Sequence, residues 1–258
     1  MGRQEPIEEV VSPDSLGWLI GADESVRGYI AESRSLALSL MLIAPLLLVY
    51  EVALVYWRPL GARRWVGEVL AVAFDTQGVI VLNFLVLLAV LVAVVILARR
   101  RRLNFSLTGW VLLESMGWAV LLVVVGVALY RRLTVLPAQS MAGAISVYAR
   151  VMSAVGAGIY EELLFRLVLA SALYLAAYHL TGRSRAAAAA FSIAVSALVF
   201  AGCHVLALDL RPLANPVDRM DTGFHLLSGL LFGWLYVYRG LGVAVYTHVI
   251  YNIIVKMV

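Results

Sequence analysis

Residues 78–98 read GVIVLNFLVLLAVLVAVVILA and contain no charged side chain over 21 positions. A second apolar run, Ala186–Leu208, has Cys203 and His204 as its only ionisable side chains over 23 residues. An apolar run of about 20 residues is long enough to cross a bilayer as a helix. The whole chain is 63% hydrophobic and only 14% charged, whereas soluble domains are about half apolar and a quarter charged. The sequence therefore predicts a membrane protein.

The same kind of run recurs along the chain and predicts an all-α, polytopic transmembrane helical bundle. Inside lipid, only helices and closed barrels satisfy every backbone hydrogen bond, and these runs lack the alternation of barrel strands. About seven spans are expected, within a range of six to eight, and one of them is long or broken. They are expected near residues 36–57, 78–98, 107–130, 142–179, 186–206, 222–238 and 240–256.

The segments outside these spans suggest how the chain is organised. The first 34 residues hold seven acidic side chains against three arginines, so 1–34 is predicted to be a polar, acidic N-terminal arm and not a signal peptide. Residues 35–258 show no linker or repeat and are expected to form a single membrane domain. The Arg99–Arg102 cluster should face the cytoplasm, which places the N-terminus inside. Segment Asp209–Asp221 is expected to be a polar loop, either a cap near His204 or an ordinary connector.

Composition narrows the classes of function. The net charge of +4 comes from arginines that lie mostly at span ends, so it does not indicate nucleic-acid binding. The single Cys203 excludes an internal disulfide and a multi-cysteine metal site. Heavy use of Arg, Ala, Val, Leu and Gly is typical of a GC-rich bacterium, so the bacterial inner membrane is the expected location. Glu51, Glu114 and Arg150 are ionisable residues at membrane depth to which the sequence assigns no role.

Glu161 and Glu162 are adjacent within a run that otherwise predicts a membrane helix. A carboxylate in hydrocarbon costs about 2.5 kcal/mol or more unless it is paired or hydrated. Glu162 and Arg166 are four residues apart and share a helix face, so they can pair. Glu161 is rotated from Glu162 by about 100° and points elsewhere. One carboxylate is therefore neutralised within its own helix while the other is available to act; a purely structural ion-pair network is the alternative.

Two later predicted helices carry further polar clusters. Phe200 and His204 lie near the end of the fifth span, and His248 and Asn252 share one face of the last span. Hydrolysis of an amide needs a base that activates water and donors that stabilise the developing oxyanion. Glu161 can act as the base, and His204 can orient the water or shuttle its proton. The side chains of His248 and Asn252 can point at the oxyanion. Taken one at a time, each cluster can also be explained by hydrogen bonds between helices.

The motifs Glu-Glu-x-x-x-Arg, Phe-x-x-x-His and His-x-x-x-Asn, in this order on late membrane helices, resemble the CPBP family. This family comprises the type II CAAX prenyl endopeptidases and the bacteriocin-processing proteins similar to them. The resemblance covers about residues 140–258, the expected protease-like core, and implies a glutamate-type intramembrane protease, a hydrolase that needs no cofactor. Its substrate would be a membrane-associated protein or peptide. The implied catalytic residues are Glu161, His204, His248 and Asn252, and the implied structural support comes from Glu162, Arg166 and Phe200.

Other functions stay open on the residues alone. Glu161, His204 and His248 are a His₂Glu set of the kind that binds zinc, although no His-Glu-x-x-His is present. His225 lies three residues before Ser228, and this pair suggests an intramembrane serine protease as an alternative. The glycine-rich context of such a serine is missing. Acidic, His and Arg side chains in a helical bundle also mark proton-coupled transporters. After an enzyme and a transporter, the third class of function is a non-catalytic membrane protein that binds a partner. The concentration of polar residues in the C-terminal half, without a repeat, favours the enzyme.

Overall fold

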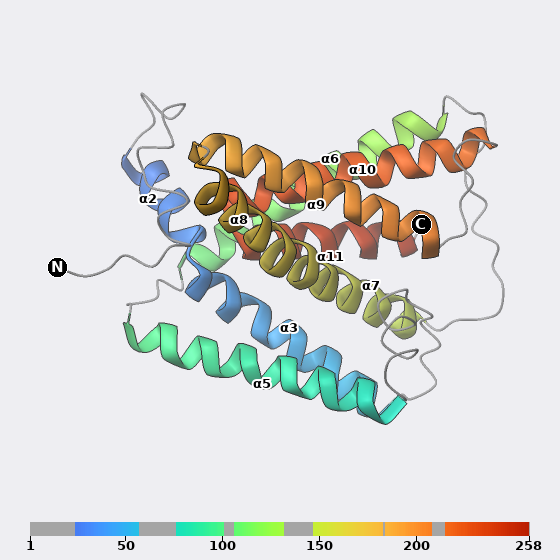
Figure 1. Cartoon of the computed structure of the whole chain (residues 1–258). Helices are drawn as coiled ribbons and strands as arrows, with labels where there is room; N and C mark the ends of the chain where they lie inside the picture. The colour runs from blue at the N-terminus through green and yellow to red at the C-terminus, as the bar shows by residue number, and fades with distance from the viewer. Residues whose placement is uncertain are drawn as a thin grey trace.

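The structure is a computed structural model that describes residues 24–56, 76–100, 106–131, 147–182, 184–207 and 215–257. These residues form helices, and within them there is no strand. Figure 1 shows the helices packed side by side in one bundle. The prediction of an all-α helical bundle is confirmed.

Each of the seven predicted spans corresponds to a helix. They are α3 (Leu36–Tyr56), α5 (Thr76–Arg100), α6 (Leu107–Arg131), the continuous α7–η2–α8 (Val147–Glu162, Leu163–Ala170, Ser171–Thr181), α9 (Arg185–Ala207), α10 (Pro216–Arg239) and α11 (Leu241–Met257). Four of the described helices, which begin at Leu36, Leu107, Val147 and Arg185, are long and apolar enough to cross a membrane. Helices α5 and α11 contain shorter apolar stretches. This is the architecture of an integral membrane protein.

Helix α11 is the centre of the bundle and contacts α3, α6, α7 and α10. Its residues Val243, Ala244 and Val245 are completely buried. Helices α3 and α5 lie next to each other along one side (Figure 1), and the outer face of α5 exposes Leu85 and Leu88. An apolar face of this kind would be unfavourable in water, but it suits contact with lipid chains.

The predicted long or broken span is an unbroken helix over its described part, with a change of helix type in the middle. Residues Leu163–Ala170 form the π-helical segment η2, which begins directly after Glu161 and Glu162. Hydrogen bonds in a π-helix span five residues, and such segments occur frequently at functional sites. Helix α8 then ends at Thr181, and the following Gly182 has a positive φ of 64°, a backbone conformation that glycine adopts without strain.

The polar segment before α10 is shorter than the sequence predicts. Helix α10 begins at Pro216 instead of near residue 222, because the Asn215 side chain accepts a hydrogen bond from the Val217 nitrogen at 2.9 Å. Asparagine is a preferred N-cap, and proline is favoured in the first turn. Asp221 therefore lies in α10 and not in a loop. Residues 208–214, which include the first six of the 13 residues of the expected cap or connector, lie outside the described residues.

The end of the predicted N-terminal arm is helical. Residues Glu24–Ser33 form α2, which contacts α3 and α6 and buries Ile30. Residues 1–23 lie outside the described part of the chain. The division into an arm and a single membrane domain stays a prediction.

Candidate active site

Helices α7 and α11 approach each other closely at Gly158. A Cβ atom at this position would lie 2.6 Å from Val249 Cγ2 and 2.8 Å from the Val249 backbone nitrogen. Carbon atoms in contact normally lie at about 3.5–4.0 Å, so only glycine permits this spacing. The residue before Val249 is His248, and the residues that follow Gly158 by one turn are Glu161 and Glu162. The close approach therefore brings an imidazole of α11 against the two carboxylates of α7.

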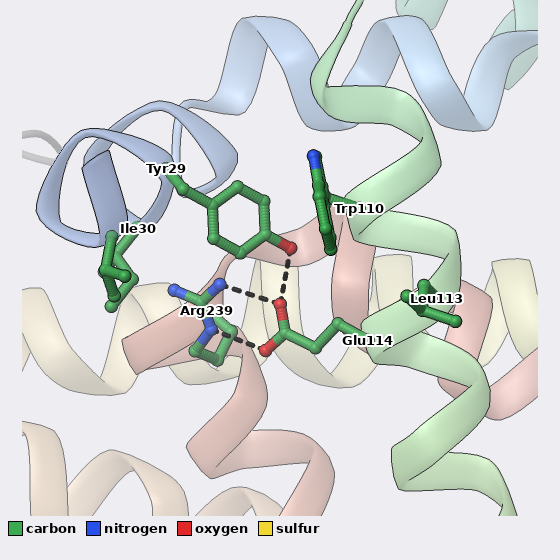
Figure 2. Close-up of a pocket in the computed structure, with 7 residues that line it drawn as sticks. Tyr29, Ile30, Trp110, Leu113, Glu114 and Arg239 are labelled. Carbon is green, nitrogen blue, oxygen red and sulfur yellow. Dashed lines mark hydrogen bonds and ion pairs between the residues drawn. The ribbon is translucent and has the colours of Figure 1, made fainter.

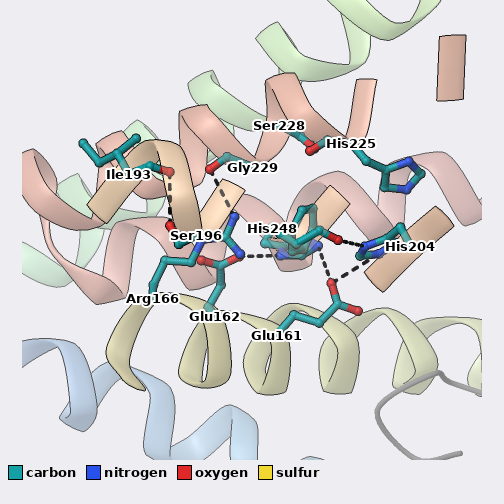
Figure 3. A network of polar contacts seen from close by, with 11 residues as sticks. Glu161, Glu162, Arg166, Ile193, Ser196, His204, His225, Ser228, Gly229 and His248 are labelled. Carbon is teal, nitrogen blue, oxygen red and sulfur yellow. Dashed lines mark hydrogen bonds and ion pairs between the residues drawn. The ribbon is translucent and has the colours of Figure 1, made fainter. Parts of the chain in front are cut away.

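The imidazole of His248 lies between the two carboxylates (Figure 3). Its Nδ1 is 2.8 Å from Glu162 Oε1, and its Nε2 is 3.7 Å from Glu161 Oε2. Helix spacing predicts Arg166 as the partner of Glu162, and Glu162 Oε1 does lie 3.2 Å from Arg166 Nη1; His248 is a second partner that the spacing does not predict. An ionised carboxylate only accepts hydrogen bonds, so His248 Nδ1 carries the proton of the bond to Glu162.

Arg166 is completely buried and is held on several sides. Its Nη2 donates to the Gly229 carbonyl at 3.2 Å, and its guanidinium carbon lies 4.6 Å from the centre of the Phe200 ring and 5.4 Å from that of Phe232. Cation–π contacts contribute about 2 kcal/mol when they are desolvated. These contacts and the Glu162 carboxylate together account for a charged side chain in the apolar interior.

Glu161 faces two imidazoles with one oxygen atom. Its Oε2 is 3.8 Å from His204 Nε2, and this is the same oxygen that lies 3.7 Å from His248 Nε2. The other ring nitrogen of His204, Nδ1, is 2.9 Å from the Phe200 carbonyl oxygen. Because a carbonyl only accepts, Nδ1 holds the proton there, and the neutral ring of His204 presents the Nε2 lone pair toward Glu161.

The two remaining predicted site residues lie close to these histidines in the chain. Phe200 is buried, and its ring centre is 4.4 Å from that of His204. Asn252 is half-buried on α11, one helical turn after His248. Side chains four residues apart project from the same face of a helix. The structure thus brings Glu161, His204 and His248 together, and the roles given to all the site residues stay predictions.

A third histidine of the site was not included among the predicted site residues. The ring of His225 on α10 stacks on that of His204, with centroids 4.3 Å apart and an angle of 26° between the planes. In the sequence, His225 is notable only for its position three residues before Ser228. The Ser228 hydroxyl instead donates to the His225 backbone carbonyl at 3.0 Å. The sequence feature that could have identified His225 as a site residue is its position as a further histidine at membrane depth, on the helix after the one that carries His204.

The His₂Glu set that the sequence offered for zinc is the same cluster of Glu161, His204 and His248. Among the residues with described positions, no group of three or more His, Cys, Asp or Glu side chains has the arrangement of a metal site. If a zinc ion were bound, these three side chains would be its ligands. Measurement of the metal content of the purified protein distinguishes a zinc site from a site that activates water without a metal.

A separate polar cluster lies where α2, α6 and the end of α10 meet (Figure 2). Arg239 donates from Nε and Nη2 to the two oxygens of Glu114, at 2.6 and 2.7 Å, and the Tyr29 hydroxyl donates to the same carboxylate at 2.6 Å. These residues and Trp110 line an open pocket of about 350 Å³. Burial raises the pKa of Tyr29, and the neighbouring Glu114 raises it further. The bidentate ion pair joins α10 to α6, and the hydrogen bond from Tyr29 ties α2 to the same carboxylate.

The other ionisable residues at membrane depth also have partners. Glu51 on α3 accepts a hydrogen bond of 2.5 Å from the Tyr160 hydroxyl. Arg150 donates to the Lys256 carbonyl at 3.3 Å. Both contacts join helices of the bundle, which gives these side chains a structural use.

The fold and this site define an integral membrane protein with a buried cluster of glutamates and histidines on its C-terminal helices. Residues 143–254 match the family described as type II CAAX prenyl endopeptidase Rce1-like. The match confirms the resemblance to the CPBP family over this segment and supports a protease in general. The segment contains Glu161, Glu162, Arg166, His204, His225 and His248. Comparison with curated proteins and with solved structures gave no match.

Proposed function

We propose that the chain is a glutamate-type intramembrane endopeptidase in which Glu161 and His204 activate water for attack on a peptide bond. The observation that carries this proposal is the convergence of two imidazoles on one carboxylate oxygen. His204 Nε2 and His248 Nε2 lie 3.8 and 3.7 Å from Glu161 Oε2. The family match of the same segment supports a protease.

The first chemical step uses two acceptors that face each other. The neutral ring of His204 presents the Nε2 lone pair, and ionised Glu161 presents a carboxylate oxygen, so a water molecule between them donates one hydrogen to each. Such a water is oriented and polarised for attack. As its oxygen bonds to the carbonyl carbon, its proton moves to Glu161. Glu161 then delivers that proton to the leaving amine as the carbon–nitrogen bond breaks.

The second set of groups stabilises the oxyanion that forms in this step. His248 and Asn252 share a face of α11, and both can donate hydrogen bonds. Because His248 Nδ1 donates to Glu162 at 2.8 Å, its Nε2 can donate to the oxyanion only when the ring holds both protons. With both protons on that ring, the two cations His248 and Arg166 face the two carboxylates Glu161 and Glu162, so the four formal charges cancel.

The proposed substrate is a membrane-associated protein or peptide that is lipidated, carries a leader or is anchored at its C-terminus. The reaction proposed above needs no cofactor, and the bilayer is the second partner. The proposed location is the bacterial inner membrane, with the N-terminus in the cytoplasm. The Arg99–Arg102 cluster, which directly follows the apolar run 78–98 in the sequence, supports this orientation under the positive-inside rule.

The test compares membranes that contain the wild-type protein with membranes that contain Glu161→Gln. Glutamine keeps the shape of the side chain but removes the base, so cleavage is expected to fall by about 10² or more. Substrates are identified as membrane proteins whose new termini form only with the wild-type chain. The purified protein is then assayed on a synthetic peptide that spans the identified bond.

Glu51→Gln is the matched control, because Glu51 is another buried carboxylate at membrane depth. Its amide oxygen still accepts the hydrogen bond from Tyr160, so cleavage is expected to remain at the wild-type level. A folded Glu161→Gln protein that still cleaves the peptide would refute the proposed function.

A further inference from the structure

The ring of His204 is contacted on its face by a second imidazole that belongs to none of the three motifs. His225 and His204 are stacked with ring centroids 4.3 Å apart, and they come from different helices, α10 and α9 (Figure 3). The ring of Phe200 contacts His204 as well, at 4.4 Å and an angle of 48°. Two rings therefore border the imidazole that faces Glu161.

His225 is itself held in place by hydrogen bonds that continue to another helix. Its Nδ1 donates to the Asp221 carbonyl oxygen at 2.7 Å. The Asp221 side chain accepts a hydrogen bond from the Tyr130 hydroxyl of α6. The Tyr130 ring lies 6.4 Å from that of Phe224, one turn of α10 after Asp221. The start of α10 is thus anchored to α6, and the ring of His225 is held in a defined position against the face of the His204 ring.

Contacts on the faces of the His204 ring help to set its plane. The bond from Nδ1 to the Phe200 carbonyl fixes the position of one ring atom, and a ring packed against the face limits the tilt of the imidazole. His204 also lies in the last turn of α9, which ends at Ala207. A stacked ring sets the plane, and with it the direction of the Nε2 lone pair toward Glu161.

We propose that His225 is a positioning residue that orients His204 through stacking of the two rings. This inference rests on the proposed function for its catalytic consequence, since His225 acts through His204 and not on the substrate. A displacement of about 1 Å at a reacting group costs about 10² in rate. Loss of one of the two ring contacts is therefore expected to reduce kcat by about tenfold, because the hydrogen bond and Phe200 remain.

The first experiment measures orientation without any substrate. The chain has four histidines, so the ring-proton resonances of His204 can be assigned in detergent by their absence from His204→Gln. His225→Ala is expected to displace these resonances, because the ring current of the stacked imidazole is lost. His225→Phe keeps an aromatic ring of similar size there, so most of the ring-current effect should remain.

The second experiment measures turnover on the identified peptide with the same variants. His225→Ala is expected to lower kcat about tenfold with KM within about twofold, and His225→Phe to stay within about threefold of wild type. His179→Ala is the control histidine, since His179 is exposed on α8 and contacts Tyr178. Its substitution should change neither measurement.

Two results would overturn the inference. Unchanged His204 resonances in His225→Ala would show that the ring does not orient His204. An equal loss of kcat in His225→Ala and His225→Phe would show that the site uses the chemistry of the imidazole and not its stacking. Should the wild-type protein cleave no peptide, the proposed function fails, while the resonances still decide whether His225 orients His204. His225→Phe fills the same space, so it keeps the test decisive where the alanine variant unfolds.

Discussion

Gly158→Ala is expected to remove most of the activity without changing any residue of the site. The added Cβ would lie 2.6 Å from Val249 Cγ2, 2.8 Å from the Val249 nitrogen and 3.0 Å from its Cα. Carbon contacts settle at about 3.5–4.0 Å, so α11 must move away from α7 by about 1 Å. The side chain of Val249 cannot absorb this shift, because two of the three contacts are with backbone atoms.

The shift of α11 is expected to act on the residue next to Val249, which is His248. Its Nδ1 lies 2.8 Å from Glu162 and its Nε2 lies 3.7 Å from Glu161, and both distances should lengthen. A displacement of about 1 Å costs about 10² in rate, and overpacking costs about 1–3 kcal/mol of stability. Turnover of the peptide and thermal unfolding in detergent measure the two effects separately.

Two companion variants make this prediction specific. Gly117 on α6 has no atom within 4 Å of the position that a Cβ would take, so Gly117→Ala should behave as wild type. Adding Val249→Ala to Gly158→Ala removes the contact with Cγ2 but leaves the backbone contacts, so recovery should be partial at most. Wild-type turnover in Gly158→Ala, or complete recovery in the double variant, would refute the idea that backbone approach sets the site.

Three further predictions concern charge, the oxyanion and metal. Arg166→Ala leaves Glu162 without its arginine partner in an apolar setting and is expected to lower the free energy of unfolding by about 3–5 kcal/mol; a stable, folded but inactive variant in thermal unfolding would instead assign Arg166 to substrate binding or catalysis. Asn252→Ala is expected to reduce kcat by roughly 10² to 10³ with KM nearly unchanged, and Asn252→Asp to be impaired as well, because an ionised carboxylate does not donate; a defect confined to KM contradicts the oxyanion role. Exhaustive chelation is expected to leave activity intact and the purified protein free of stoichiometric zinc. One zinc per chain, with activity lost and restored alongside it, would make Glu161 and the site histidines ligands and the mechanism Lewis-acid activation of water.

Much of the fold followed from the sequence because hydropathy is a local property of the chain. An apolar run such as 78–98 has no favourable place except lipid or a buried core, and every predicted span is a helix in the structure. Spacing along a helix is also local, so four-residue separation correctly predicted that Glu162 and Arg166 pair. The family resemblance followed from the same local motifs, and the match of residues 143–254 confirms it.

Boundaries and long-range partners were harder to predict, because they depend on local capping or on residues far away in the chain. Helix α10 begins early because Asn215 and Pro216 form its start. Glu114 had no assigned partner, and its partner is Arg239, which is 125 residues later. No spacing rule connects two such positions, since they meet only when α6 and α10 pack together.

The arrangement of the site was decided by tertiary structure alone. The sequence placed Glu161 and Glu162 on different faces of one helix, yet both contact the single ring of His248 through its two nitrogens. The stacking of His225 on His204 depends in the same way on how neighbouring helices pack. These contacts arise from the separation and rotation of whole helices, which Gly158 sets between α7 and α11. Side-chain types determine which chemistry is available, and helix packing determines which atoms meet, because a distance between two helices is a property of neither sequence segment by itself.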